Sequence, residues 1–191
     1  KQLYMDIYDD SMWLINLVEN LLAVTRIEEG RLNLRITEDL MDDVITEALH
    51  HINRKSKEHH ISVESKEEFL LAKMDAKLIV QVIINIVDNA IKYTPKNSHI
   101  VIRTEKRGKQ AIVSISDDGN GIADEIKPRI FDMFYSGANR IADSRRSLGL
   151  GLSLCKSIIN AHGGELTVSD NLPHGTVFTF TLPAGEVKVY E

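Results

Sequence analysis

Apolar residues in the first 30 positions of the chain recur mainly at helical spacing. The residues on this spacing are Met5, Trp13, Leu17, Leu21 and Val24. Because Gly30 supplies a stop signal, the pattern predicts one helix over residues 2–29. Its apolar stripe should pack on another helix as well as on the domain that follows.

The period of the pattern changes after this helix. Every second residue from Leu32 to Ile36 is apolar, which predicts a half-buried strand. Residues 37–57 return to helical spacing, with acidic residues in the first turn, where the helix dipole favours them. Alternation over residues 61–64 then predicts a short strand.

The clearest helical pattern begins after Asp75. It predicts a helix from Ala76 to Tyr93, with Asp75 as the N-cap and Pro95 ending it. Further along we expect strands over residues 100–106 and 111–117, a loop-rich stretch over 118–148, a helix over 151–162, and strands over 166–169 and 177–182. Helices and mostly antiparallel strands in this order predict an α/β (α+β) sandwich with helices on one face of the sheet.

Composition narrows the class of protein. The 191 residues carry 23 basic and 28 acidic side chains without a basic block, so nucleic acid is not an expected partner. The single cysteine, Cys155, cannot form an intrachain disulfide, which is typical of a cytosolic compartment. No apolar stretch is long enough to cross a bilayer. Because the chain begins at Lys1, we expect a piece of a longer protein, with any membrane anchor outside it.

Four polar residues form a stripe on the otherwise apolar helix that follows Asp75. They are Asn85, Asn89, Lys92 and Tyr93, and their spacing keeps them on one face. One interpretation is a solvent-facing edge. The alternative is a site for Mg²⁺ and phosphate, because carboxamide oxygens suit a hard cation and lysine pairs with phosphate.

A carboxylate ends the apolar row of the predicted strand 111–117. Asp117 shares a face with Val113 and Ile115, so it should be buried and need a partner. The sequence from Asp117 to Gly121 is Asp-Asp-Gly-Asn-Gly, which could be no more than a glycine-rich turn. The functional alternative is that Asp117 accepts a hydrogen bond from an exocyclic amine such as that of adenine, while glycines let the backbone approach the ligand.

Glycines also open the helix predicted over residues 151–162. In the sequence Leu148-Gly149-Leu150-Gly151-Leu152 they expose backbone N–H groups where a phosphate would be stabilised. The pattern lacks the Lys-Ser/Thr pair of a Walker loop and the preceding strand of a dinucleotide fingerprint. Both of those nucleotide folds are therefore disfavoured.

In this order, the motifs resemble the histidine-kinase branch of the GHKL ATPase superfamily. Five segments of the chain resemble the conserved boxes of this family. They are Asn85-Ile-Val-Asp-Asn89-Ala-Ile-Lys92-Tyr93-Thr94-Pro95 (N box), Asp117-Asp-Gly119-Asn-Gly121-Ile122 (first glycine box), Ile130-Phe131-Asp132-Met133-Phe134 (F box), Gly149-Leu150-Gly151-Leu152 (second glycine box) and Gly175-Thr176-Val-Phe178-Thr-Phe180 (last glycine box). The resemblance covers nearly everything from Leu32 to Pro183, and its subfamily features are similar to the potassium-sensing Kdp-type kinases.

The resemblance implies a two-layer Bergerat sandwich, with a mixed, mostly antiparallel sheet, that binds ATP and Mg²⁺. In it, Asn89 with Asn85 would hold Mg²⁺, Lys92 would contact phosphate, Tyr93 would flank the base and Asp117 would bind adenine. Residues 132–150 would form a lid over the nucleotide. The other residues implied in nucleotide binding are Gly119, Gly121, Ile122, Phe134, Arg145, Arg146, Gly149, Leu150, Gly151, Leu152 and Thr176.

The same resemblance implies a kinase rather than an ATPase. Hydrolysing relatives carry a glutamate base where this chain has Asn85, and an amide cannot take a proton from water at neutral pH, so the γ-phosphoryl should survive for transfer. Ser147 and Leu148 depart from the second glycine box, which leaves a nucleotide-sensing module without transfer as an alternative. A clamp-driving ATPase is the third hypothesis.

None of the seven histidines stands in the context of the family's phospho-acceptor. The pairs His50-His51 and His59-His60 are expected to be solvated, and His162 to be a residue at a helix C-terminus.

Residues 1–30 resemble the end of the second helix of the family's dimerisation domain, and 31–191 the catalytic domain. The implied partners are the protein's own dimerisation domain with the acceptor histidine, a response regulator, and a second copy in a homodimeric receptor. This piece would be the receptor's cytoplasmic part.

Overall fold

A computed structural model describes residues 33–52, 58–133, 135 and 150–186. Six positions nearer the N-terminus, residues 4, 11, 15, 18, 22 and 25, are also described, and each is helical. The rest of the helix predicted over 2–29, the domain boundary at residue 30 and most of the lid predicted over 132–150 lie outside the described residues. Within the described residues, no helix is both long and apolar enough to cross a bilayer.

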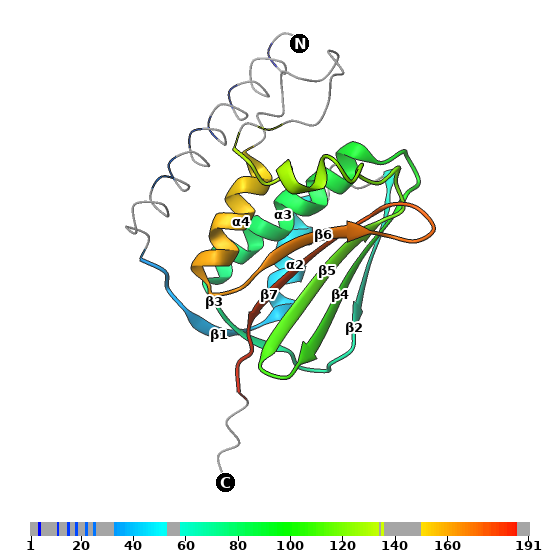
Figure 1. Ribbon diagram of the computed structural model, residues 1–191. Coiled ribbons are helices and arrows are strands. Elements are labelled where there is room, and N and C mark those ends of the chain that lie inside the picture. The colour runs from blue at the N-terminus through cyan, green and yellow to red at the C-terminus, as the bar shows by residue number, and fades with distance from the viewer. Residues whose placement is uncertain are drawn as a thin grey trace.

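A five-stranded sheet and the helices that cover one of its faces form the two layers of the domain (Figure 1). The strand order is β2-β4-β5-β7-β6; β2 pairs with β4 in parallel and the other pairs are antiparallel. The sheet is therefore mixed and mostly antiparallel, as predicted. The strands are β2 (His60–Ser65), β4 (His99–Arg107), β5 (Gln110–Asp117), β6 (Leu166–Asp170) and β7 (Thr176–Pro183).

Three helices, α2 (Met41–Ile52), α3 (Ala76–Tyr93) and α4 (Gly151–Ala161), lie on the sheet. The apolar face of α3 is buried in the core between its neighbours, which is why its periodicity predicted both of its ends. Asp75 is the N-cap by position only: its carboxylate accepts the backbone N–H of Arg35 (3.1 Å) and makes no capping bond. At the other end the chain turns extended at Thr94, before Pro95.

The strand predicted over residues 32–36 is wrong. Residues 33–36 belong to no strand, and β1 is Thr37–Leu40, where the sequence had predicted the start of a helix. The reason is tertiary: β1 pairs antiparallel with β3 (Leu71–Met74), a four-residue strand whose length gives it little periodicity to detect. The helix α2 consequently begins only at Met41.

A buried histidine joins the end of α4 to the start of α3. His162 is the C-cap of α4, which agrees with its predicted place at the C-terminus of a helix, and its side chain bridges two backbone groups. The backbone N–H of Asp75 donates to Nε2 (3.0 Å), so the ring proton is on Nδ1, which donates to the carbonyl of Ile158 (2.7 Å). The neutral imidazole thus fixes one end of the α3–α4 pair.

Two adjacent glycines after α4 offer a matched test of the packing. A Cβ at Gly164 would lie 1.8 Å from the carbonyl oxygen of Thr181, whereas Gly163 has φ +72° and open space around it. We expect Gly164→Ala to lower the free energy of unfolding by about 3 kcal/mol through the steric clash, and Gly163→Ala by about 1 kcal/mol through its left-handed backbone. Urea denaturation of both variants measures this; equal losses would contradict the close approach at Gly164.

Candidate functional site

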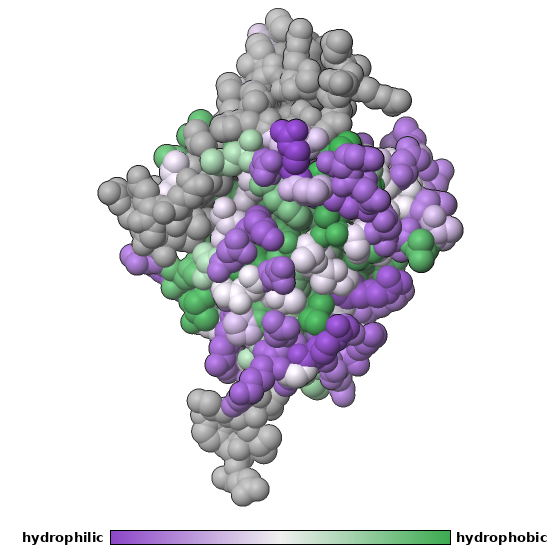
Figure 2. All heavy atoms as spheres, viewed as in Figure 1, coloured by the Kyte–Doolittle hydropathy of each residue, from purple (hydrophilic) through white to green (hydrophobic). Residues whose placement is uncertain are grey.

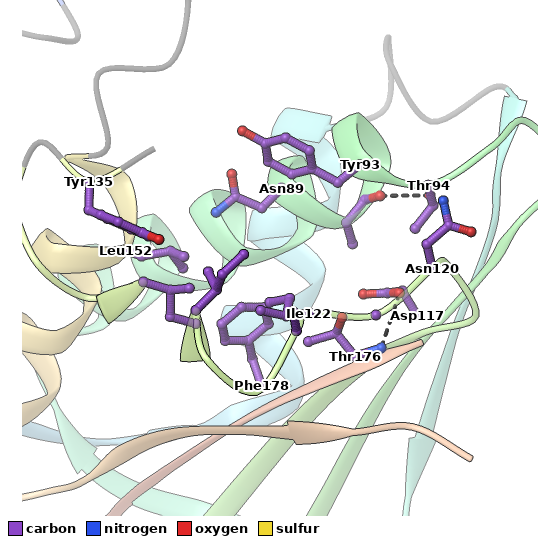
Figure 3. Close-up of a pocket in the computed structure, with 15 residues that line it drawn as sticks. Asn89, Tyr93, Thr94, Asp117, Asn120, Ile122, Tyr135, Leu152, Thr176 and Phe178 are labelled. Atoms are coloured by element: carbon purple, nitrogen blue, oxygen red, sulfur yellow. Dashed lines mark hydrogen bonds between the residues drawn. The ribbon is translucent and has the colours of Figure 1, made fainter. Parts of the chain in front are cut away.

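A cavity of about 360 Å³ opens between α3, the loop after β5, the first turn of α4 and β7 (Figure 3). It brings together seven of the residues that the sequence predicted for the site: Asn89, Tyr93, Asp117, Gly121, Ile122, Leu152 and Thr176. The rest of its wall is largely apolar. The cavity is thus a concave, mostly apolar pocket with a few polar groups, the form that a small-molecule site takes.

The polar floor of the cavity is Asp117, the last residue of β5. Its side chain is only 7% exposed, and Oδ1 accepts the backbone N–H groups of Gly119 (2.9 Å) and Thr176 (3.2 Å). Burial raises the pKa of this carboxyl, although the two N–H donors lower it, and the neighbouring carboxylate of Asp118 raises it further. The apolar row Val113, Ile115 and Asp117 is therefore confirmed as an inward-facing row that ends in a carboxylate.

Two glycines allow the loop after Asp117 to pass close to its neighbours. A Cβ at Gly119 would lie 2.7 Å from Cγ2 of Thr94 and 3.0 Å from Oδ1 of Asp117, so a side chain there would disturb the carboxylate. Gly121 has φ +74°, which favours glycine. The turn interpretation and the binding interpretation of this segment are consequently compatible, since the turn shapes the cavity wall.

The predicted stripe on α3 is only partly at the cavity. Asn89 and Tyr93 line it, whereas Asn85 and Lys92 do not. Lys92 is exposed, with Nζ 5.2 Å from the centre of the Tyr93 ring. The positively charged group therefore lies at the rim of the site, beside an aromatic ring that is 57% exposed.

Asn85 lies one turn before Asn89, where α3 meets α4. Its Oδ1 accepts a hydrogen bond from Nε2 of Gln81 (3.4 Å), and the buried Nδ2 lies toward the thiol of Cys155. A Cβ at Gly151 would lie 3.9 Å from the carboxamide. Asn85 thus faces the first turn of α4 rather than the cavity.

The first turn of α4 forms one flank of the cavity (Figure 3). Leu152 lines the cavity, while Leu150 precedes the helix and is 4% exposed. Gly151 is the first residue of the helix, so backbone N–H groups without helical partners face this end. Phe134, Arg145, Arg146 and Gly149, which the sequence also assigned to nucleotide binding, lie outside the described residues.

Several residues of the cavity wall were not predicted as site residues. They include Thr94, Asn120, Tyr135 and Phe178. Thr94 and Phe178 belong to motifs that the sequence had identified, so their motifs were the available signal. Tyr135 follows the F box, and the guanidinium of Arg129 lies 4.5 Å from its ring centre, a cation–π contact that no periodicity reveals.

One member of the histidine pairs differs from the expectation. His50, His51 and His60 are exposed, but His59 is half-buried, and its Nε2 lies 3.1 Å from Oγ1 of Thr94. Because the Thr94 hydroxyl donates to the carbonyl of Ala90 (2.6 Å), His59 must be the donor in this bond. His59 therefore supports the cavity wall.

Among the described residues no cluster of histidine, cysteine and acidic residues could hold a metal ion.

Residues 74–186 match the family described as "histidine kinase-, DNA gyrase B-, and HSP90-like ATPase". The chain belongs to this family. Sensor protein KdpD of Clostridium acetobutylicum is 41% identical over 183 residues, which cover 96% of this chain and 20% of KdpD. The chain therefore spans about a fifth of the length of this relative.

Solved structures of histidine kinases share the fold. The histidine kinase AdeS of Acinetobacter baumannii superposes with a TM-score of 0.80, at 24% identity, covering 97% of this chain and 86% of that one. The histidine kinase ThkA, in a complex with the response regulator protein TrrA, gives a TM-score of 0.70 at 30% identity, covering 90% of this chain and 49% of that one. The predicted two-layer fold and the family resemblance are confirmed.

The raised pKa of Asp117 predicts a pH-dependent cost of folding. A carboxyl with a higher pKa in the folded than in the unfolded chain costs stability where it is ionised, and this cost vanishes as the pH falls below the unfolded value. We expect Asp117→Asn, which keeps an acceptor for both N–H groups, to be more stable than the parent at pH 7, with the gain shrinking in acid. Urea denaturation at several pH values measures it.

Asp118 provides a control of opposite sign. Partial burial raises the pKa of its carboxyl, but the hydrogen bonds from His99 outweigh burial and the pKa is lowered overall. Asp118→Asn should therefore be less stable than the parent at pH 7, and this loss should also shrink in acid. A loss of stability in both variants at pH 7 would contradict the burial cost assigned to Asp117.

Proposed function

We propose that this chain is the ATP-binding catalytic domain of a two-component sensor histidine kinase, and that it transfers the γ-phosphoryl of ATP to a histidine outside these residues. The observation that carries the proposal is the buried carboxylate of Asp117 at the floor of an apolar cavity. A buried charge costs stability, so a protein keeps one where it serves a ligand.

Adenine fits the floor of the cavity. Both described N–H donors to the Asp117 carboxylate bind Oδ1, so Oδ2 is left to accept the exocyclic amine of the base. Phe178, Ile122 and Ile130 supply apolar surface for the ring, and Tyr93 stands at the rim, where it can flank the base. The phosphates would then extend toward the start of α4 and toward Lys92.

The residues at the phosphate end suit Mg²⁺. Asn89 places a carboxamide on the cavity wall, and magnesium binds few protein ligands because it also uses phosphate oxygens and water. Asn85 lies one turn away and faces the first turn of α4, so it would lie near the phosphates. When bound, the metal would neutralise charge that develops on the phosphates during transfer.

An amide at position 85 also distinguishes between activities. An ATPase needs a base that takes a proton from water, and the carboxamide of Asn85 cannot do so. A clamp ATPase is therefore disfavoured. A nucleotide-sensing module without transfer remains the second candidate, because Ser147 and Leu148 depart from the family's pattern.

We propose homodimerisation through the helix that precedes the domain. Ile15, Val18 and Leu22 follow the three–four spacing of a coiled-coil seam, and each is about half exposed although apolar. An apolar seam of this kind favours a second helix as partner. The resemblance to ThkA, whose solved complex contains the response regulator protein TrrA, supports a response regulator as the other partner. We also propose a cytoplasmic location, where a response regulator could reach the domain.

The binding step is tested with Asp117→Asn. Replacing the charged acceptor by an amide should weaken ADP by about 2 kcal/mol, roughly thirtyfold, because a hydrogen bond to an ionised group is lost. Asp118→Asn is the matched control, since that carboxylate bonds to His99 and does not line the cavity. Calorimetry with ADP and Mg²⁺ measures both; unchanged affinity in Asp117→Asn would remove this residue from the site.

The transfer step is tested with an added dimerisation domain that carries the acceptor histidine. The chain with γ-labelled ATP should label that domain slowly, since an untethered acceptor lacks effective concentration. The product should be acid-labile and base-stable. Asn89→Ala should abolish labelling, whereas Asn160→Ala, at an exposed position of α4, should not. Nucleotide binding without labelling of the domain would favour the sensing module.

A further inference from the structure

The hairpin between β6 and β7 lies against the end of β5, where Asp117 is the last residue. The β6–β7 ladder ends at the pair Asp170 and Thr176, and the β5–β7 ladder ends at Ser116 and Val177. Beyond these pairs the two segments are no longer held by strand pairing. Here, hydrogen bonds from side chains of the hairpin hold the two segments together.

Asn171 makes the central contact between the two segments. Its Nδ2 donates to the backbone carbonyl of Asp117 (2.8 Å), and its backbone N–H donates to the carbonyl of Gly175 (3.0 Å), which closes the hairpin on itself. From the other side of the hairpin, the N–H of Thr176 binds Oδ1 of Asp117. The hairpin therefore holds Asp117 by its carbonyl and by its carboxylate at once.

Two neighbours reinforce the contact. Nδ1 of His174 lies 2.9 Å from the carbonyl of Asp118, which it can reach only as a donor. At Gly175 a Cβ would lie 1.9 Å from the carbonyl oxygen of Asp117, so only glycine lets the backbones approach this closely. The main chain at Asp117 is consequently fixed from two directions.

We infer that Asn171 is a positioning residue that aims the carboxylate of Asp117 and so sets the preference for adenine over other bases. A carboxylate binds the exocyclic amine only if one of its oxygens points at the amine. Within the described residues the N–H groups of Gly119 and Thr176 both bind Oδ1, which leaves Oδ2 for the base. Loss of the Asn171 amide would release the carbonyl of Asp117, and the carboxylate would then take a wider range of orientations. The inference rests on the proposed binding of adenine nucleotides.

The test compares ADP with IDP, whose base has a carbonyl oxygen in place of the amine. Both would be measured by displacement of a fluorescent ADP analogue. The parent chain should prefer ADP, and Asn171→Ala should weaken ADP by about fivefold, the net value of one hydrogen bond, with IDP unchanged. The ADP/IDP ratio should then fall about fivefold, a readout that a general loss of stability would not move.

Two further variants complete the design. Asn171→Ser retains a short donor and should recover part of the ratio, and Asn160→Ala, at an exposed position, should leave the ratio unchanged. An unchanged ratio in Asn171→Ala, or an equal loss for both nucleotides, would overturn the inference while leaving the proposed function in place. A parent chain without preference for ADP over IDP would overturn both.

Discussion

The burial of one ionised carboxylate at the end of a central strand is the constraint on which the site depends. β5 lies between β4 and β7, so the inward row that ends at Asp117 is covered on both sides. Within the described residues, two backbone N–H groups stabilise the charge through Oδ1 and no cationic side chain contacts it, so Oδ2 can accept from a ligand. A ligand amine can therefore complete the arrangement without displacing a salt bridge.

The sequence predicted those parts of the fold in which local pattern and tertiary environment agree. The pattern for α3 was unambiguous because its apolar face is buried along its whole length, and the β4–β5 hairpin had alternation and a glycine turn. The sequence did not predict β1 and β3, because strands of four residues are defined by their pairing partner rather than by a local pattern. Thr37 of β1, for example, pairs with Met74 of β3, far along the sequence.

The sequence predicted those site residues that belong to recognisable motifs, but not how they lie relative to one another. Asp117 and Asn89 were identified from position and residue type, and both line the cavity. The motif also grouped Asn85 and Lys92 with them. Helical spacing shows which residues share a face of the helix, but not which other elements that face meets. Asn85 faces the start of α4, and Lys92 lies at the rim of the cavity beside Tyr93. Asn171 belongs to no motif, because its role depends on a hydrogen bond between segments 54 residues apart.

The joint at His162 explains how a site built from separate elements keeps its shape. α3 carries the asparagines and α4 begins at the end of the cavity where we propose that the phosphates bind, so their relative position sets the distance between Asn89 and the N–H groups of the first turn of α4. His162 fixes the pair at the far end, where the start of α3 meets the end of α4. Because helices are stiff along their axes, an anchor at one end limits the movement at the other to a tilt about that end. An anchor of this kind would let the near end adjust to the proposed nucleotide while the core beneath it stays packed.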